Sequence, residues 1–135
     1  MFFIQRFGVY HWKNFEFEDN SKKDKYFITL NCNLNDVEIA LVLPTSQVEK
    51  YNNFPNRLID TIVILSEESK FFKKNTLIDL KNIKYFEAIA IYEAVERGKI
   101  NYLGLLEEKL TKKIEQTIKE AITLSPKLKK QFLCE

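Results

Sequence analysis

The segment VEIALVLP, residues 37–44, decides the expected fold class, because every residue from 37 to 43 except Glu38 is apolar. A short, continuous apolar run of this kind is typical of a strand that is buried on both faces of a sheet. Proline has no N–H to donate to a neighbouring strand, so Pro44 marks the end of the run. We therefore expect a β-sheet that holds this strand in a covered position.

Further strand-like segments lie on both sides of this run. Towards the N-terminus, residues 9–17 are rich in aromatic side chains and residues 26–30 are of β-forming types, with a charged loop between them. Residues 33–36 have the composition of a turn. Towards the C-terminus, a long polar connection precedes two more predicted strands, at residues 58–65 and 76–80. Five short strands are thus expected before any helix.

The pattern becomes helical from Tyr85 onward, where apolar residues recur on one side until Gly98. From Leu105, apolar residues recur at steps of three and four with Lys and Glu between them, which predicts an amphipathic helix. Ser125 as N-cap and Pro126 at the first helical position predict a last, short helix.

Length and element order together predict one α+β domain over residues 1–135. We expect a β-barrel over about residues 7–82 and a helical part over about 85–135. The strands are joined by connections too short for parallel crossovers, so we expect a mostly antiparallel sheet. A small, curled barrel fits this order best.

Composition excludes several classes of protein. No apolar run approaches the roughly 18–20 residues that cross a bilayer, so no membrane partner is expected. No export signal is visible at the N-terminus, which favours a cytoplasmic protein in which Cys32 and Cys134 remain thiols. His11 is the one histidine and lies near no cysteine cluster, so we expect neither a metal nor another cofactor. The net charge of +2 permits contact with a polyanion without requiring it.

Residues 8–19 resemble the first strand and loop of the MazF/PemK toxins, which start at a glycine and end in Phe-Pro-Phe-Thr-Asp. The matching residues are Gly8, Phe15, Phe17 and Asp19, whereas Val9 stands for the usual Asp and Glu16 for the Pro.

Other pieces follow in the order of that family. They are a basic residue opening the second strand (Lys25), a Thr-Ser pair closing the third (Thr45 and Ser46), residues 75–80 near the fifth strand, and a Gly-Leu helix opening at residues 104–105. The order of these pieces carries the resemblance, which covers about residues 7–120.

The resemblance implies an SH3-like barrel followed by helices, a homodimer, and a metal-independent endoribonuclease that a cognate antitoxin neutralises. Cleavage of RNA by its own 2′-hydroxyl needs a base, groups that stabilise charge on the phosphate, and an acid for the leaving oxygen. The family places an Arg and a Thr there. By position Lys25 replaces the Arg, Thr45 matches the Thr, and Ser46 adds a second hydroxyl, so these three are the predicted catalytic residues. Lysine offers phosphate a point charge where arginine offers a planar fork.

Basic and polar residues in the predicted loops are candidates for contact with single-stranded RNA, because lysines meet phosphates and nearby aromatic rings stack on bases. The predicted RNA-binding residues are Asp19, Lys22, Lys23, Gln47, Lys50, Lys73 and Lys74, and Arg57 and Lys70 belong to the same basic set. The interleaved rings are Tyr51, Phe54, Phe71 and Phe72.

Each candidate also has a structural interpretation. Lys25 has the sequence context of a solvated lysine, and Thr45 and Ser46 that of turn hydroxyls bonded to the backbone. Histidine is a common general base, but His11 lies in a strand among aromatic residues and is expected to be structural. Two functions therefore stay open: the ribonuclease, and a catalytically inactive barrel that acts as an RNA-binding or protein-interaction module. The lysine in place of arginine favours the second.

Overall fold

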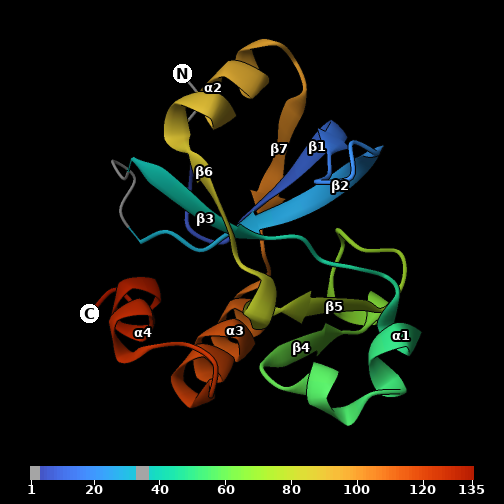
Figure 1. The fold of residues 1–135 in the computed structure, drawn as a ribbon, viewed down its shortest axis with the longest axis vertical. Coiled ribbons are helices and arrows are strands. Elements are labelled where there is room, and N and C mark those ends of the chain that lie inside the picture. The colour runs from blue at the N-terminus through green and yellow to red at the C-terminus, as the bar shows by residue number, and fades with distance from the viewer. Residues whose placement is uncertain (1–3, 33–36) are drawn as a thin grey trace.

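The computed structural model describes residues 4–32 and 37–135, and its centre is a five-stranded antiparallel sheet in the order β6-β3-β2-β1-β7 (Figure 1). The strands of this main sheet are β1 (Gly8–Glu16), β2 (Lys22–Thr29), β3 (Glu38–Val42), β6 (Lys84–Glu87) and β7 (Ile100–Leu105). A separate antiparallel hairpin is formed by β4 (Thr61–Ile64) and β5 (Thr76–Asp79). The helices are α1 (Val48–Asn52), α2 (Ala88–Glu96), α3 (Glu108–Glu120) and α4 (Pro126–Phe132), with short 3-10 turns at Pro55–Leu58, Ser66–Glu68 and Leu80–Asn82.

The main sheet is covered on both faces, because its strands alternate between two apolar clusters. One face presents Val9, Ile28 and Val42 to the first cluster, and the other presents Phe27 and Leu41 to the second. Successive side chains of a strand point to opposite faces, so strands with apolar residues at every position are covered twice. The prediction that the run in β3 is buried on both faces is confirmed.

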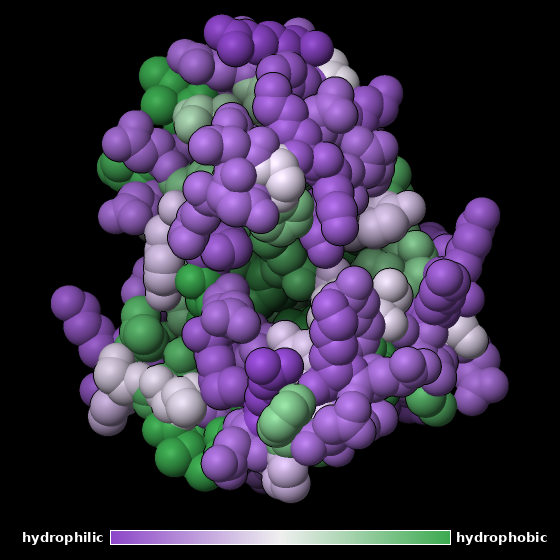
Figure 2. All heavy atoms as spheres, turned by 45° about the vertical axis from the view of Figure 1, so that its right-hand side comes forward, coloured by the Kyte–Doolittle hydropathy of each residue, from purple (hydrophilic) through white to green (hydrophobic). Residues whose placement is uncertain are grey.

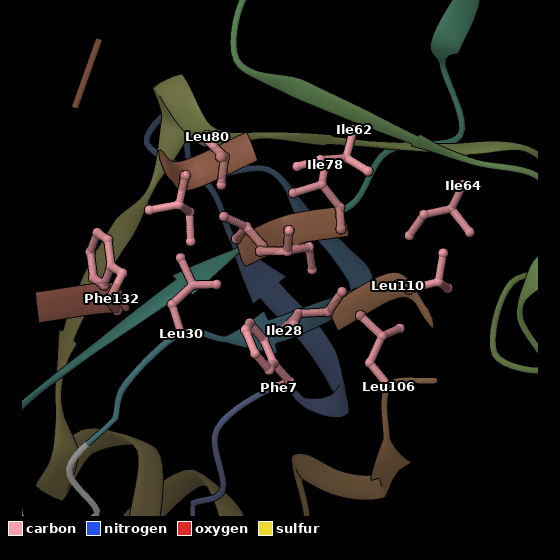
Figure 3. Close-up of a cluster of buried hydrophobic side chains, with 14 of the residues drawn as sticks. Phe7, Ile28, Leu30, Ile62, Ile64, Ile78, Leu80, Leu106, Leu110 and Phe132 are labelled. Carbon is pink, nitrogen blue, oxygen red and sulfur yellow. The ribbon is translucent and has the colours of Figure 1, made fainter. Parts of the chain in front are cut away.

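The first cluster lies between the main sheet, the β4–β5 hairpin, α3 and α4 (Figure 3). Helix α3 contributes Leu110, Ile114 and Ile118, all with no exposed surface, at the four-residue spacing that places side chains on one helix face. Burial of one such side chain contributes about 1.5–3 kcal/mol. This cluster fixes the hairpin against the sheet.

The second cluster lies under α2, whose Ile91 and Ala94 pack on Phe27 and Leu41 of the sheet. The helix is followed by Gly98, whose φ of +73° is the left-handed conformation that glycine adopts without strain. The predicted helix end at Gly98 is confirmed, as is the N-cap at Ser125, whose hydroxyl accepts a hydrogen bond from the Leu128 N–H at 3.2 Å.

The α+β class and the antiparallel sheet are confirmed, but the five-stranded sheet is not closed into a barrel. After Pro44 the chain leaves the sheet, and β4 and β5 pair with each other and pack against α3 instead of extending the main sheet. An isolated bridge between Thr45 and Leu77 is where the segment after β3 meets the hairpin.

Three expected elements are corrected. Residues 85–87, expected in a helix, belong to β6, and Leu105, expected to open the long helix, ends β7. Most of β6 and all of β7 therefore lie in the region expected to be helical, 85–135. Both are edge strands with several exposed residues, which weakens the alternation that identifies a strand. Five strands were expected before the first helix, but helix α1 lies between β3 and β4 and therefore follows only three strands. The turn predicted at residues 33–36 lies outside the described residues.

The expectation of two thiols is wrong in this structure, since Cys32 and Cys134 form a disulfide with an S–S distance of 1.96 Å. The Phe132 side chain is 1% exposed in the first cluster, and the Arg6 guanidinium donates to its carbonyl at 2.7 Å. This packing brings the end of α4 beside the segment after β2, where the Cα atoms of the two cysteines are 5.5 Å apart. In the described ranges, no helix has the length and apolar character needed to span a bilayer.

Candidate functional site

A cleft of about 680 Å³ opens where three segments meet: the β1–β2 turn with the start of β2, the residues after β3, and the loop before β5. We call it the main cleft. Figure 2, which turns the right-hand side of Figure 1 forward, shows hydrophilic side chains around a hollow with an apolar floor. The residues that line the main cleft are Phe17, Asp19, Ser21, Lys23, Asp24, Lys25, Tyr26, Pro44, Thr45, Ser46, Gln47, Lys70, Phe71, Phe72, Lys73, Lys74 and Thr76.

Most of the predicted site residues meet in this cleft. All three predicted catalytic residues line it, as do five of the predicted RNA-binding residues: Asp19, Lys23, Gln47, Lys73 and Lys74. Lys50 lines a neighbouring pocket instead. Lys22 is exposed and lines neither of the two.

The tight turn between β1 and β2 forms one wall. The Phe17 N–H donates to the Ser21 carbonyl at 2.9 Å, and Asn20 has a φ of +66°, a conformation that asparagine tolerates better than most residues. The Asp19 carboxylate accepts from the Ser21 hydroxyl at 2.6 Å and from its N–H at 2.9 Å. These bonds lower the pKa of Asp19, so at neutral pH it is an anion that stabilises the turn.

Lys25 is half-buried in the middle of β2, opposite Trp12 of β1. Burial lowers the pKa of its ammonium group, and the positive charge of Lys23 lowers it further. The Nζ lies 5.7 Å from the ring centre of Phe17, a distance at which the face of the ring attracts a cation. The Phe17 ring therefore attracts the Lys25 ammonium group, while burial and Lys23 make that group lose its proton more readily.

Thr45 and its neighbours form the opposite wall. The backbone of Thr45 pairs with Leu77 through two hydrogen bonds of 2.8 and 3.0 Å, which fixes this segment to β5. The Thr45 hydroxyl accepts from the Gln47 N–H at 3.1 Å, the turn geometry that the structural interpretation expects. Accepting that bond uses an oxygen lone pair and leaves the O–H able to donate to a ligand. Ser46 is exposed beside it.

The loop before β5 supplies three exposed lysines, and two phenylalanines anchor it. Phe72 is 6% exposed in the first cluster and meets the ring of Tyr26 edge to face, with 5.9 Å between centres. Phe71 packs over Gly104 of β7, where an added Cβ would lie 3.2 Å from the ring. Because the rings of Phe71 and Phe72 are packed, they hold the backbone of the loop in place, and Lys70, Lys73 and Lys74 extend from it at the cleft.

Glu107, just before α3, ties the same loop to the helix. Its carboxylate accepts from the Ser69 hydroxyl at 2.8 Å and from the Lys70 N–H at 2.9 Å. The Ser69 hydroxyl in turn accepts from the Phe71 N–H at 3.2 Å. Sequence reasoning missed this role, because Glu107 and Lys70 are 37 residues apart and no local pattern joins them.

His11 is not among the residues that line the main cleft. Its Nε2 lies 3.7 Å from a carboxylate oxygen of Asp24, and its ring contacts that of Tyr26 at 5.3 Å. The other oxygen of Asp24 accepts from the Asn14 N–H at 3.0 Å, next to the irregularity in β1. The expected structural role of His11 agrees with these contacts, and Asp24 is a cleft residue that the sequence did not single out.

The described residues hold no group of three or more His, Cys, Asp or Glu side chains arranged to bind a metal ion. No protein-family model and no curated protein matches the sequence.

Proposed function

We propose that the chain is a toxin-type, metal-independent endoribonuclease that binds single-stranded RNA in the main cleft and cleaves it there. The observation that carries the proposal is that Lys25, Thr45 and Ser46, from two separate segments, line one cleft that also holds Lys23 and the 70–74 loop. Five lysines face two aspartates in this cleft, and such a balance attracts a polyanion. Phe17 and Phe71 add rings on which bases can stack.

The proposed reaction is an attack of the RNA 2′-hydroxyl on the adjacent phosphorus. A bond forms between O2′ and phosphorus, the bond from phosphorus to O5′ breaks, and the products end in a 2′,3′-cyclic phosphate and a 5′-hydroxyl. Lys25, as an ammonium ion, stabilises the charge that develops on the phosphate and gives its proton to O5′. Its lowered pKa makes it a better acid than an exposed lysine. The hydroxyls of Thr45 and Ser46 donate to phosphate oxygens and position them.

A base must take the proton from the 2′-hydroxyl, and the cleft holds two carboxylates. Asp19 is held in the turn by hydrogen bonds from the Ser21 hydroxyl and N–H, which lower the pKa of its carboxyl group. We assign the role to Asp24, the neighbour of Lys25 in β2. After the reaction Asp24 releases this proton to solvent and Lys25 takes up a proton from solvent, so both groups return to their starting states.

The resemblance to the MazF/PemK toxins supplies the rest of the proposal. We propose that the main sheet and the hairpin form an open variant of the SH3-like barrel, that the chain acts as a homodimer, and that a cognate antitoxin neutralises it. The segment after β3 pairs with the hairpin at the isolated Thr45–Leu77 bridge, and this contact between the two sheets supports the proposal of an open barrel.

The test is to incubate the purified protein with a long RNA in EDTA and map the new 5′ ends. We expect discrete cuts with 5′-hydroxyl ends, which disappear in Lys25→Ala and fall at least about a hundredfold in Asp24→Asn. Asparagine keeps the oxygen that accepts from the Asn14 N–H, so Asp24→Asn removes the base without removing that bond. Lys99→Ala, at an exposed lysine outside the cleft, should cut like the wild type. RNA that stays intact with the wild-type protein would refute the nuclease.

A second candidate is a catalytically inactive module that binds RNA or a protein. The bond from the Gln47 N–H to the Thr45 hydroxyl favours it, because that bond gives the hydroxyl a structural role without any ligand. In that case the wild-type protein leaves the RNA uncut in the same assay, and a separate binding measurement shows whether it binds RNA.

A further inference from the structure

A second pocket, of about 630 Å³, adjoins the main cleft. We call it the side pocket. Four residues line both pockets, Phe17, Lys25, Thr45 and Gln47, and we call these shared residues the ridge. Beyond the ridge the side pocket is lined by Leu43, Lys50, Tyr51, Arg57, Asp79, Lys81, Asn82 and Lys84.

The side pocket is strongly basic. Lys25, Lys50, Arg57, Lys81 and Lys84 line it, against one carboxylate, that of Asp79.

That one carboxylate is already satisfied. Asp79 is 8% exposed, and it accepts from the Tyr51 hydroxyl at 3.2 Å, the Asn82 amide at 3.0 Å and the Lys81 N–H at 2.9 Å. The Lys81 ammonium lies 2.9 Å from it and also donates to the carbonyls of Arg57 and Ile59. Asp79 and Lys81 therefore neutralise each other, and the remaining basic side chains set the charge of the pocket.

The remaining side chains face the pocket on a supported surface. Arg57 stacks on the ring of Phe54, with 4.8 Å to the ring centre, and Lys84 is half-buried in β6, paired with Leu41 of β3. Lys50 is exposed on α1. Three cations from three different elements converge on one concave surface, which is the arrangement that tracks a phosphate backbone.

We infer that the side pocket binds backbone phosphates of the same RNA strand, so that the RNA crosses the ridge and is held on both sides of it. This inference rests on the proposed function, because it takes the ridge residues Lys25 and Thr45 as the point of cleavage. It adds Arg57 and Lys84 to the binding surface and explains why Lys50, which lies outside the main cleft, belongs to it.

The test uses a single-stranded 2′-O-methyl RNA, which has no free 2′-hydroxyl and therefore reports binding without cleavage. Its Kd is measured across a series of salt concentrations for the wild type and for the triple variant Lys50→Gln, Arg57→Gln, Lys84→Gln. A matched triple variant, Lys99→Gln, Lys127→Gln, Lys130→Gln, removes the same charge from exposed positions that line neither pocket.

We expect the side-pocket variant to bind about tenfold more weakly, and its slope of log K against log salt to fall by about two, since each phosphate contact on a single strand contributes about 0.7. The matched variant should keep most of the wild-type slope. Equal Kd values and slopes for the two variants, or no binding by the wild type, would overturn the inference. The binding assay does not measure cleavage, so the two proposals can fail separately. Binding that depends on the side pocket supports the inference even if the cleavage assay in EDTA leaves its RNA intact. Cleavage in that assay supports the nuclease even if the side-pocket variant binds like the wild type, a result that overturns the inference.

Discussion

The two ends of β2 belong to regions of opposite character. At its start, Lys22 to Asp24 are exposed and lie at the rim of the main cleft or beside it, whereas at its end Phe27 and Ile28 are fully buried between the two apolar layers. In the hairpin both residues are buried, but Thr76 lines the cleft whereas Ile78 lies in the first cluster. The same strands thus supply a core at one end and a basic cleft at the other, so stability and the proposed chemistry rest on different residues.

The strongest test of this separation removes apolar contacts of a residue that does not line the cleft. Leu110 of α3 has no exposed surface, so Leu110→Ala should lower the free energy of unfolding by about 2–5 kcal/mol, measured by urea denaturation. Ile122→Ala, at a position that is 79% exposed, should change it by less than about 0.5 kcal/mol. A similar loss in both variants would contradict the assignment of the first cluster as the core.

The disulfide is the second test. It joins residues 102 apart, so its removal frees a long loop of the unfolded chain. The double variant Cys32→Ser, Cys134→Ser should lose about 2–4 kcal/mol of stability under oxidising conditions. The wild type with a reducing agent should unfold at the same denaturant concentration as the double variant. If reduction has no effect on the wild type, the two thiols are not joined in solution.

Asp60 links the start of β4 to the loop after α3, and its removal should have a smaller effect. Its carboxylate accepts from the N–H groups of Ile122 and Thr123 and from the Thr123 hydroxyl. Burial raises the pKa of Asp60, but these hydrogen bonds outweigh burial and lower it overall. Asp60→Asn suits the φ of +56° and should lose about 1 kcal/mol at neutral pH.

The sign of the pH dependence follows from the lowered pKa. The stabilisation by Asp60 is fully present above the ordinary aspartate pKa of 3.8 and is lost as the pH falls through the lower native value. The stability difference between wild type and Asp60→Asn should therefore shrink in acid. A difference that stays constant from neutral pH to below that value would show that the carboxylate charge plays no part.

The smallest effect on stability is expected at the cleft, with the opposite sign. Because burial and Lys23 lower the pKa of Lys25, its charged form is disfavoured in the folded chain. Lys25→Met keeps the apolar stem and should stabilise the protein by about 0.5 kcal/mol at neutral pH while RNA cleavage is lost. The gain should decline as the pH rises through the lowered native pKa, because the native lysine then loses its proton first. A variant that is less stable than the wild type would show that the charge contributes to the fold.

The sequence predicted those parts of the fold that local patterns determine. Residues 37–43 gave a doubly covered strand, and Ser125 with Pro126 gave a capped helix, because a run of apolar residues or a capping hydroxyl acts within a few positions. The strands β6 and β7 were missed, because each lies at a sheet edge and its pairing partner, β3 or β1, is distant in the sequence. The disulfide was missed for the same reason, since the packing of Phe132 places Cys134.

The candidate site divides in the same way. Lys25, Thr45 and Lys73 were singled out by residue type and order, and the cleft that joins them is a finding of the structure. Glu107 and Asp24 act through contacts with Lys70 and Asn14, which no spacing in the sequence indicates. Long-range contacts of this kind are set by tertiary packing and not by local propensity.

The most direct test of the central claim is an NMR titration of ¹⁵N-labelled protein with single-stranded 2′-O-methyl RNA. We predict that the largest changes in backbone amide shifts fall on the cleft and its ridge, at Lys25, Gln47 and Lys73, and that Ile91 of α2 and Ile118 of α3 change little. Changes centred on α2, or no changes at RNA concentrations that saturate a basic cleft, would contradict the claim that the main cleft binds RNA.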